Sequence, residues 1–369
     1  MDDNPKAFKH WFSPAVAKDL AARLFALDPT FDRRAYARVT APLATLELKP
    51  RVALIAEALH AAIKHPFAEA AELLCRTLPP PTDPAIPNTY QIVAWPMCHF
   101  VGRYGLPYHG PSMRALHALT QHFSAEFDIR HFLLADQART LKSLHRWLAD
   151  PSEHVRRLVS EGTRTRLPWG VRLQPFIDDP SPVLPLLDAL HADPSAYVRR
   201  SVANNLNDLA KDHPDLVVDR IRRWRSPTPE HRALAQRALR TLIKSGHPDA
   251  LGLLGVAPGA RIDVDGFTAS AAVRIGDALS LEASLTNPGD SDLTVVVDFA
   301  LHYAGPDGRT RAPKVFKWKT FVLPARGNAT VAKRHPMREV SIRRLHPGTH
   351  RVDLQVNGER VASRTFALH

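Results

Sequence analysis

The residues best suited to chemistry lie in one short segment, 160–170, which places a carboxylate, two cations and an indole ring close together. Glu161 comes at the end of a predicted helix, where the helix dipole does not favour an anion. Arg164 and Arg166 follow at once, and Trp169 stands just beyond a proline. The segment therefore combines an acid, bases and an aromatic ring within a few residues. A glycine after the acid also predicts a left-handed helix C-cap, at Gly162.

A second acid, Asp208, lies in a predicted amphipathic helix. Apolar residues recur there at helical spacing, which indicates that one side packs against other helices; they are Val198, Val202, Leu206 and Leu209. The opposite face is predicted to present cations, amides and one carboxylate to solvent. Its residues are Arg199, Arg200, Asn204, Asn207, Asp208 and Lys211. A third acid, Glu126, flanks an aromatic residue together with Asp128.

A carboxylate among arginines weakens simple binding to phosphate, but it is useful where a positive charge must be stabilised. Cleavage of an N-glycosidic bond builds an oxocarbenium-like sugar, and carboxylates can stabilise that cation and hold a water for attack. A tryptophan face adds about 0.5–2 kcal/mol of cation–π attraction. Structural alternatives stay open. Glu161 can pair with Arg164 or Arg157, Asp208 can pair with Lys211 or Arg200, and Trp169 can fill a core.

Composition favours a polyanionic partner. The 369 residues carry a formal net charge of +12 without a single basic tail, which most simply indicates nucleic acid; a protein that is merely basic is the alternative. No apolar run reaches the roughly 18–20 residues of a membrane span, and no signal peptide is evident at the start. Two cysteines, Cys75 and Cys98, permit one disulfide at most, so a reduced, cytoplasmic protein is expected.

Residues 1–255 are predicted to form a helical-repeat domain. The segment 147–157 resembles 190–200, and paired-helix units of about 40–47 residues are typical of HEAT-type solenoids. This repeat would place Arg156 and Arg157 in positions equivalent to Arg199 and Arg200, unless Asp-Pro-Ser merely marks a good helix start. Helices are predicted at 14–27, 32–41, 50–63, 67–77, 111–123, 136–149, 152–161, 180–191, 195–211, 214–223, 229–244 and 250–254.

Residues 260–369 are predicted to form an immunoglobulin-like β-sandwich, after a boundary at 256–259. Short alternating runs and hairpin-type turns at 287–290 and 357–358 replace the helical pattern. Strands are predicted at 260–264, 271–273, 278–286, 293–301, 314–322, 329–336, 348–356 and 360–367. The proline-rich segment 78–87 is predicted to be a rigid linker or loop.

One predicted strand of this sandwich is basic. Alternation puts Lys317 and Lys319 on one face, and Phe316 and Trp318 on the other. The functional interpretation is a second clamp on DNA. The structural interpretation places the aromatic rings in the core and the lysines in solvent.

Several of these segments resemble the signatures of the AlkC family of alkylation-repair DNA glycosylases, within the HEAT-like superfamily that includes AlkD. They are 31–33, 46–49, 100–106, 119–123, 126–130, 150–157, 160–169 and 198–216. The match spans most of residues 5–255, and the β domain is similar to the immunoglobulin-like domain of one AlkC branch. The resemblance implies a monofunctional glycosylase that excises 3-methylcytosine and 3-methyladenine from double-stranded DNA. It implies no metal, no organic cofactor and no deep base pocket.

Carried over by motif, the resemblance implies roles for individual residues. Glu161 and Asp208 would be the acids nearest the sugar and base, Glu126 a supporting acid, and Trp169 a ring packed on the lesion or its sugar. Phosphates would be held by Arg156, Arg157, Arg164, Arg166, Arg199, Arg200 and Lys211. Lys317 and Lys319 join them through the clamp interpretation of the basic strand, not through a motif. The resemblance also implies a monomeric bacterial protein, cytoplasmic and associated with the nucleoid when bound to DNA. The alternative is a non-catalytic HEAT-repeat DNA-binding or scaffold protein.

Overall fold

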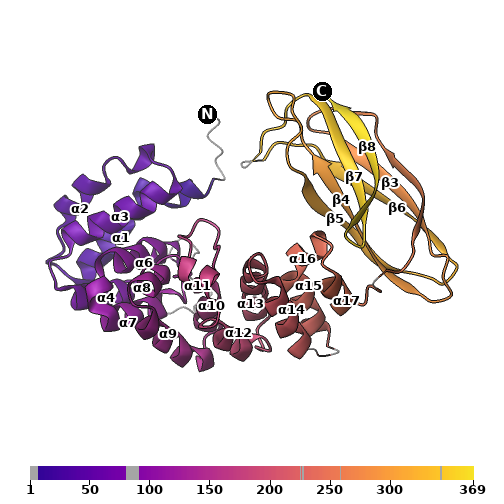
Figure 1. The fold of residues 1–369 in the computed structure, drawn as a ribbon. Helices are drawn as coiled ribbons and strands as arrows, with labels where there is room; N and C mark the ends of the chain where they lie inside the picture. The colour runs from indigo at the N-terminus through magenta and orange to yellow at the C-terminus, as the bar shows by residue number, and fades with distance from the viewer. Residues whose placement is uncertain (1–6, 80–90, 225, 227, 258, 341–342) are drawn as a thin grey trace. The chain divides into compact units, whose positions relative to one another are not determined.

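The computed structural model describes residues 7–79, 91–224, 226, 228–257, 259–340 and 343–369. Helices occur as far as Leu253, and strands follow from Asp263 (Figure 1). The predicted fold class, helices followed by a β-sandwich, is confirmed. The chain divides into two compact units, Met1–Asp212 and His213–His369. This division falls before the change from helix to strand, so the last helices belong to the same unit as the sandwich.

The first unit is built of α-helices. Their bounds are α1 (Pro14–Leu27), α2 (Arg33–Thr40), α3 (Leu48–Ala62), α4 (Phe67–Arg76), α6 (Ala94–Tyr104), α7 (His109–Leu119), α8 (Ile129–Ala135), α9 (Gln137–Arg146), α10 (Glu153–Gly162), α11 (Gln174–Asp178), α12 (Leu184–Leu190) and α13 (Ala196–Leu209). Most begin close to the predicted positions, because side chains such as Ser13 and Asp32 accept hydrogen bonds from first-turn N–H groups.

Three of these helices, α6, α8 and α11, are absent from the sequence predictions. Helix α6 buries residues around most of its circumference, including Trp95, Met97 and Phe100, so it lacks the amphipathic period that reveals a surface helix. Its Pro96 lies in the first turn, where a missing N–H is tolerated. Helices α8 and α11 have 7 and 5 residues, too few for a pattern that needs a window of about 11–18 residues.

The predicted repeat has the same local structure in both copies. Ser152 and Ser195 each precede a helix with φ of −79° and ψ of 122°. Two residues earlier, a carboxylate accepts the backbone N–H of that serine, Asp150 over 2.9 Å and Asp193 over 2.8 Å. Each turn is therefore closed by its own aspartate before the helix begins.

The predicted equivalence of Arg156 and Arg199 is also confirmed. The Nη1 group of each donates to the carbonyl oxygens of the Asp-Pro pair in its own turn. Arg156 also donates from Nε to the Asp193 carboxylate over 2.7 Å, which links one repeat to the next. These arginines therefore complete the turns of the repeat.

Helices α10 and α13 pack against each other. Val202 and Leu206 are fully buried, which confirms the predicted apolar stripe of α13. The prediction that its opposite face is solvent-exposed is wrong for Asn207 and Asp208, which are both buried. The reason is that Arg164, from the segment after α10, covers Asp208 and neutralises its charge.

The second unit begins with helices α14 (Pro214–Arg223), α15 (Pro229–Ala238), α16 (Arg240–Lys244) and α17 (Pro248–Leu253). The strands that follow are β1 (Asp263–Ala269), β2 (Ala272–Val273), β3 (Ala278–Thr286), β4 (Leu293–His302), β5 (Lys314–Leu323), β6 (Asn328–Pro336), β7 (Gly348–Val356) and β8 (Glu359–Leu368). They form two sheets, with the orders β1-β3-β6 and β2-β8-β7-β4-β5. All pairings are antiparallel except that of β2 with β8.

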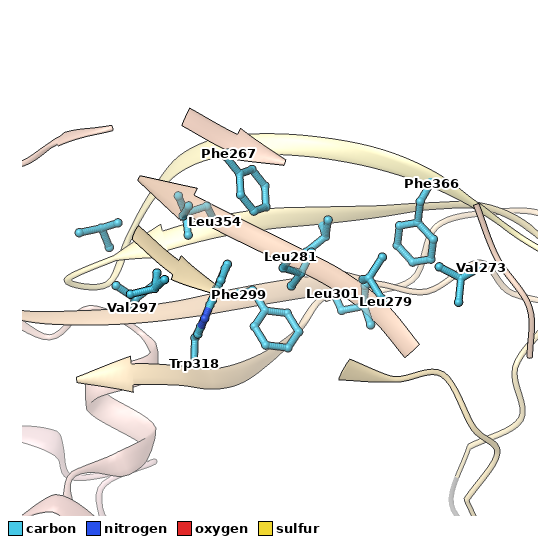
Figure 2. Packing of buried hydrophobic residues seen from close by; sticks show 14 of the residues in the cluster. Phe267, Val273, Leu279, Leu281, Val297, Phe299, Leu301, Trp318, Leu354 and Phe366 are labelled. Atoms are coloured by element: carbon cyan, nitrogen blue, oxygen red, sulfur yellow. The ribbon is translucent and has the colours of Figure 1, made fainter. Parts of the chain in front are cut away.

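The core of the sandwich lies between the two sheets (Figure 2). Trp318 is 8% exposed and packs edge-on against Phe299, with ring centroids 6.1 Å apart. Phe316 stacks on the same ring. Lys317 and Lys319, which flank Trp318 in the sequence, are exposed. The structural interpretation of the β5 aromatics is therefore confirmed, and the lysines lie on the solvent side.

Helix α16 is fastened to the sandwich by polar contacts and by one close backbone approach. The ammonium of Lys244 donates to the carbonyl oxygen of Val315 over 2.9 Å, and Gln355 donates to the carbonyl oxygen of Lys244 over 2.7 Å. Gly246 and Gly358 meet here, both with positive φ. A Cβ on Gly358 would lie only 2.0 Å from the Cα of Gly246, so this contact requires glycine.

The predicted linker at 78–87 lies outside the described residues from residue 80 onward. In the part of the chain that the structure describes, no helix combines the length and the apolar character that a membrane span requires. Cys75 and Cys98 are free thiols.

We predict that Gly358→Ala destabilises the second unit by more than about 2 kcal/mol. The added methyl group would collide with the backbone of Gly246, and an alanine would have to adopt the left-handed φ of this position. Gly308→Ala is the matched control, since its φ is also positive (71°) and nothing lies within 4 Å of an added Cβ. It should show the conformational cost alone, about 1 kcal/mol. Urea unfolding measures both, and equal losses would contradict the steric argument.

Candidate functional site

An open pocket of about 500 Å³ in the first unit brings together three of the four residues predicted to be catalytic. Glu126, Glu161 and Trp169 all line it. Arg157 and Arg164 line the same pocket. The acids come from the loop before α8 and from the end of α10, and the indole ring comes from the segment after α10.

The fourth residue, Asp208, is joined to this pocket through a shared arginine. The guanidinium of Arg164 donates from Nη1 to Glu161 Oε1 over 2.6 Å and from Nε to Asp208 Oδ2 over 2.8 Å. All three side chains are less than a tenth exposed. The other carboxylate oxygen of Asp208 accepts from Lys211 Nζ over 3.2 Å. Glu161 and Asp208 therefore flank one cation and do not lie on opposite surfaces.

The charge of Arg164 is secured by these partners. Burial lowers the pKa of its guanidinium, but the carboxylates of Glu161 and Asp208 together outweigh burial, so the pKa lies above its usual value. Arg164 is thus a permanent cation between two acids. The structural alternative predicts two of these pairs, Glu161 with Arg164 and Asp208 with Lys211, whereas the pair of Asp208 with Arg164 is not among its predictions. The ion pairing places both acids in fixed positions with little freedom to rotate.

A second arginine holds the remaining acid. Arg157 Nη1 lies 2.9 Å from Glu126 Oε2, its Nη2 lies 3.7 Å from Glu161 Oε1, and its guanidinium lies 4.7 Å from the centroid of the Tyr197 ring. Burial lowers the pKa of Arg157, and Glu126 with Glu161 raises it above the usual value. Ser201 donates to Glu161 Oε2 over 2.6 Å. The acids and arginines therefore form one connected network at the pocket.

Trp169 projects from this network. Its side chain is 60% exposed, so it does not fill a core. Its backbone has φ of 66°, a left-handed conformation that is a genuine outlier for so bulky a residue. The ammonium of Lys49 donates to its carbonyl oxygen over 2.5 Å. Such strain persists only where the surroundings enforce it and occurs preferentially at functional sites.

The loop that carries Trp169 is fixed by hydrogen bonds from Arg130, which is fully buried. Its guanidinium donates to the carbonyl oxygens of Gly162 over 3.0 Å, Arg164 over 2.6 Å and Val171 over 2.8 Å. These carbonyls belong to the two ends of the loop that carries Trp169. Burial, and to a smaller extent the charge of Arg164, lowers the pKa of Arg130 to about 10. Sequence reasoning missed this residue, because nothing in the pattern shows that an arginine is buried.

Gly162 also differs from its prediction. It is the last residue of α10 and lacks a left-handed φ, so the predicted glycine C-cap is wrong. A Cβ here would lie 2.6 Å from Ile129 Cγ2. Glycine is needed because helix α10 approaches α8 closely at this point.

The predicted phosphate ligands divide into two groups. In the first group, a carboxylate or backbone carbonyl oxygens already bind each guanidinium; its members are Arg156, Arg157, Arg164, Arg166 and Arg199. The partner of Arg166 is Asp212. Arg200, Lys317 and Lys319 are exposed, and Lys211 is 40% exposed although it contacts Asp208. The exposed group is better placed to meet an anion. The DNA-binding role of every member stays a prediction.

Comparison with known proteins identifies the class of this molecule. Residues 263–369 match the family model described as the C-terminal Ig-like domain of the uncharacterised protein YhaZ. The YhaZ protein of Bacillus subtilis is 34% identical over 323 residues, 88% of each chain. The fold is thus that of a helical protein with an immunoglobulin-like domain at its C-terminal end.

A solved structure extends the similarity to nearly the whole chain. It is the alkylpurine DNA glycosylase AlkC of Pseudomonas fluorescens, bound to DNA containing an abasic site analog. The identity is 37% and the TM-score is 0.91, over 98% of this chain and 99% of that one. The protein belongs to the AlkC family, in the branch with an immunoglobulin-like C-terminal domain, as its sequence motifs predict.

We predict that Arg130→Met destabilises the first unit by about 3 kcal/mol, because three carbonyl oxygens lose their donor in a buried position. Chymotryptic cleavage after Trp169 should become faster, since the loop is no longer fixed at its ends. Arg172→Met, at an exposed arginine of the same loop, should change stability by less than about 0.5 kcal/mol. An Arg130→Met protein with unchanged cleavage at this loop would show that Arg130 does not hold it.

Proposed function

We propose that this protein is a DNA glycosylase that hydrolyses the N-glycosidic bond of cationic N3-alkylated bases, 3-methylcytosine and 3-methyladenine, in double-stranded DNA. The observation that carries the proposal is the pocket in which Glu126, Glu161 and Trp169 meet, with Asp208 tied to it through Arg164. The similarity to a glycosylase at 37% identity over 98% of the chain supports it.

The chemistry follows from charge. An alkylated ring nitrogen makes the base cationic, and the departing base leaves a sugar that turns positive. Carboxylates fixed by Arg157 and Arg164 are preorganised acceptors for that charge and for a water molecule, and they need no rearrangement during the reaction. The exposed indole of Trp169 offers a π face to the positive charge that the base and the sugar share during cleavage. The base itself supplies the leaving group, so no deep pocket, metal or organic cofactor is required.

The proposed roles keep the assignments that the family resemblance implies. Glu161 and Asp208 act as the acids nearest the sugar and base, Glu126 supports them, and Trp169 packs on the lesion. The protein works as a monomer in the bacterial cytoplasm, on DNA of the nucleoid. The single strongest alternative, a scaffold without activity, leaves the strained tryptophan and its neighbouring acids without a use.

We predict that Glu161→Gln and Asp208→Asn each lower the single-turnover rate of base release on the order of 100-fold, while binding to abasic DNA is kept. Glu126→Gln should have a smaller effect, about 10-fold. The assay is release of free 3-methyladenine and 3-methylcytosine from methylated DNA.

Glu153→Gln, at an exposed acid of the same helix α10, is the matched control and should keep the wild-type rate. Thermal unfolding of each variant separates lost chemistry from lost structure, since Glu161 and Asp208 also pair with Arg164. Wild-type protein that binds DNA but releases neither base would establish the scaffold instead.

We predict that Lys317 and Lys319 on β5 contact DNA phosphates. The double variant Lys317→Ala/Lys319→Ala should weaken binding uniformly across sequences and reduce the slope of log K against log salt concentration by about 2. Arg274→Ala, at an exposed cation between β2 and β3, should leave the slope unchanged. Equal slopes for wild-type protein and the lysine variant would remove the β domain from the interface.

A further inference from the structure

A second cavity, of about 450 Å³, adjoins the pocket described above. Three aromatic residues, Trp95, Phe127 and Trp169, line both spaces. The rings of Trp95 and Phe127 are stacked, with centroids 5.4 Å apart, and helix α3 contributes Ala53 to the lining. Its size and its largely apolar walls with few polar groups are those of a small-molecule site.

The polar side of this cavity is a histidine oriented by a buried acid. His99 Nδ1 lies 3.2 Å from Asp128 Oδ1, and both residues line the cavity. Asp128 is fully buried, and its Oδ2 atom has no hydrogen-bond partner among the described residues. Gly102 makes room for it, because a Cβ there would lie 2.8 Å from Asp128 Oδ1.

A buried carboxylate with one partner is unfavourable unless it serves another group. Here it fixes the ring of His99, whose side chain remains 31% exposed. A hydrogen bond from Nδ1–H to Asp128 leaves Nε2 as the atom that His99 can offer to a molecule in the cavity. The arrangement is a built hydrogen-bonding position in a cavity lined by three aromatic residues. Trp95 is 7% exposed and its ring already stacks on Phe123 and Phe127, so Trp169, at 60% exposed, is the ring open to a ligand.

We propose that this cavity binds a nucleobase, stacked on the exposed ring of Trp169, with one edge hydrogen-bonded to His99. Stacking suits any base, because every base has a π face, and the histidine adds a directional contact. An anionic ligand fits poorly, since Asp128 repels it and the Lys49 ammonium is already hydrogen-bonded to the carbonyl oxygen of Trp169. The identity of the ligand rests on the proposed function, because N-glycosidic cleavage releases a base beside this cavity.

The base can come from two sources, and two measurements distinguish them. Free adenine and free 3-methyladenine, titrated into the full-length protein without DNA and followed by ligand-observed NMR, represent a base after release. A duplex with one unpaired adenine, compared with a fully paired duplex, represents a base still attached to its strand.

Two variants change the cavity, and a third variant is their matched control. Ala53→Met fills the space from α3 without removing a polar group. His99→Asn keeps an amide nitrogen near the position of Nδ1 for Asp128 and removes Nε2, so the buried carboxylate keeps its partner. Ala61→Met makes the same change on the same helix, at a partly exposed position away from the cavity.

Wild-type protein should bind the free base, and Ala53→Met and His99→Asn should each weaken that binding at least tenfold, while Ala61→Met stays within twofold. If instead the variants abolish only a preference for the unpaired duplex, the site is kept and its ligand is an attached base. That result would contradict the proposed absence of base seating. The proposed site is overturned if the wild-type protein neither binds the free base nor prefers the unpaired duplex. It is also overturned if both properties are equal in the wild-type protein and the three variants. Base release from methylated DNA, measured in parallel, tests the proposed function separately.

Discussion

The site depends on one interaction, the buried guanidinium of Arg164 between the carboxylates of Glu161 and Asp208. These acids belong to different helices, α10 and α13, and would repel each other if they approached without a cation. The arginine allows both to be buried at once, and its fixed fork sets their orientation. Removing Arg164 would leave two buried carboxylates without the cation between them, which is far more costly than the pair itself is favourable. The geometry of the acids is thus part of how the helices pack.

The loop that follows α10 is rigid at its ends and exposed at its tip. Its two ends are fastened by Arg130 through backbone carbonyls, whereas its tip presents Trp169 to solvent. Hydrogen bonds to carbonyls do not depend on the side chains of the loop, so the clamp holds a backbone shape. The fixed shape then delivers the indole ring beside the acids.

Much of the fold could be predicted because local patterns decide it. Ser13 and Pro14 mark the start of α1, and Pro214 marks that of α14. Both helices begin and end where the sequence predicts, and alternation reveals β3 and β7. Helix α6 could not be predicted in the same way, since a helix buried on nearly all sides shows no period. The candidate acids were recognisable by type and motif. Their joint attachment to Arg164 was not, because the choice among several nearby arginines depends on tertiary packing.

The left-handed backbone of Trp169 lowers the stability of the folded protein. A left-handed φ disfavours any residue with a Cβ by roughly 1–2 kcal/mol, and glycine is free of that penalty. Exchange to glycine would therefore relax the backbone and raise thermal stability, while it would delete the indole. Selection for robustness alone would drive the tryptophan out of this position. Its presence indicates that the chain gives up some resistance to unfolding in exchange for an aromatic surface at the pocket.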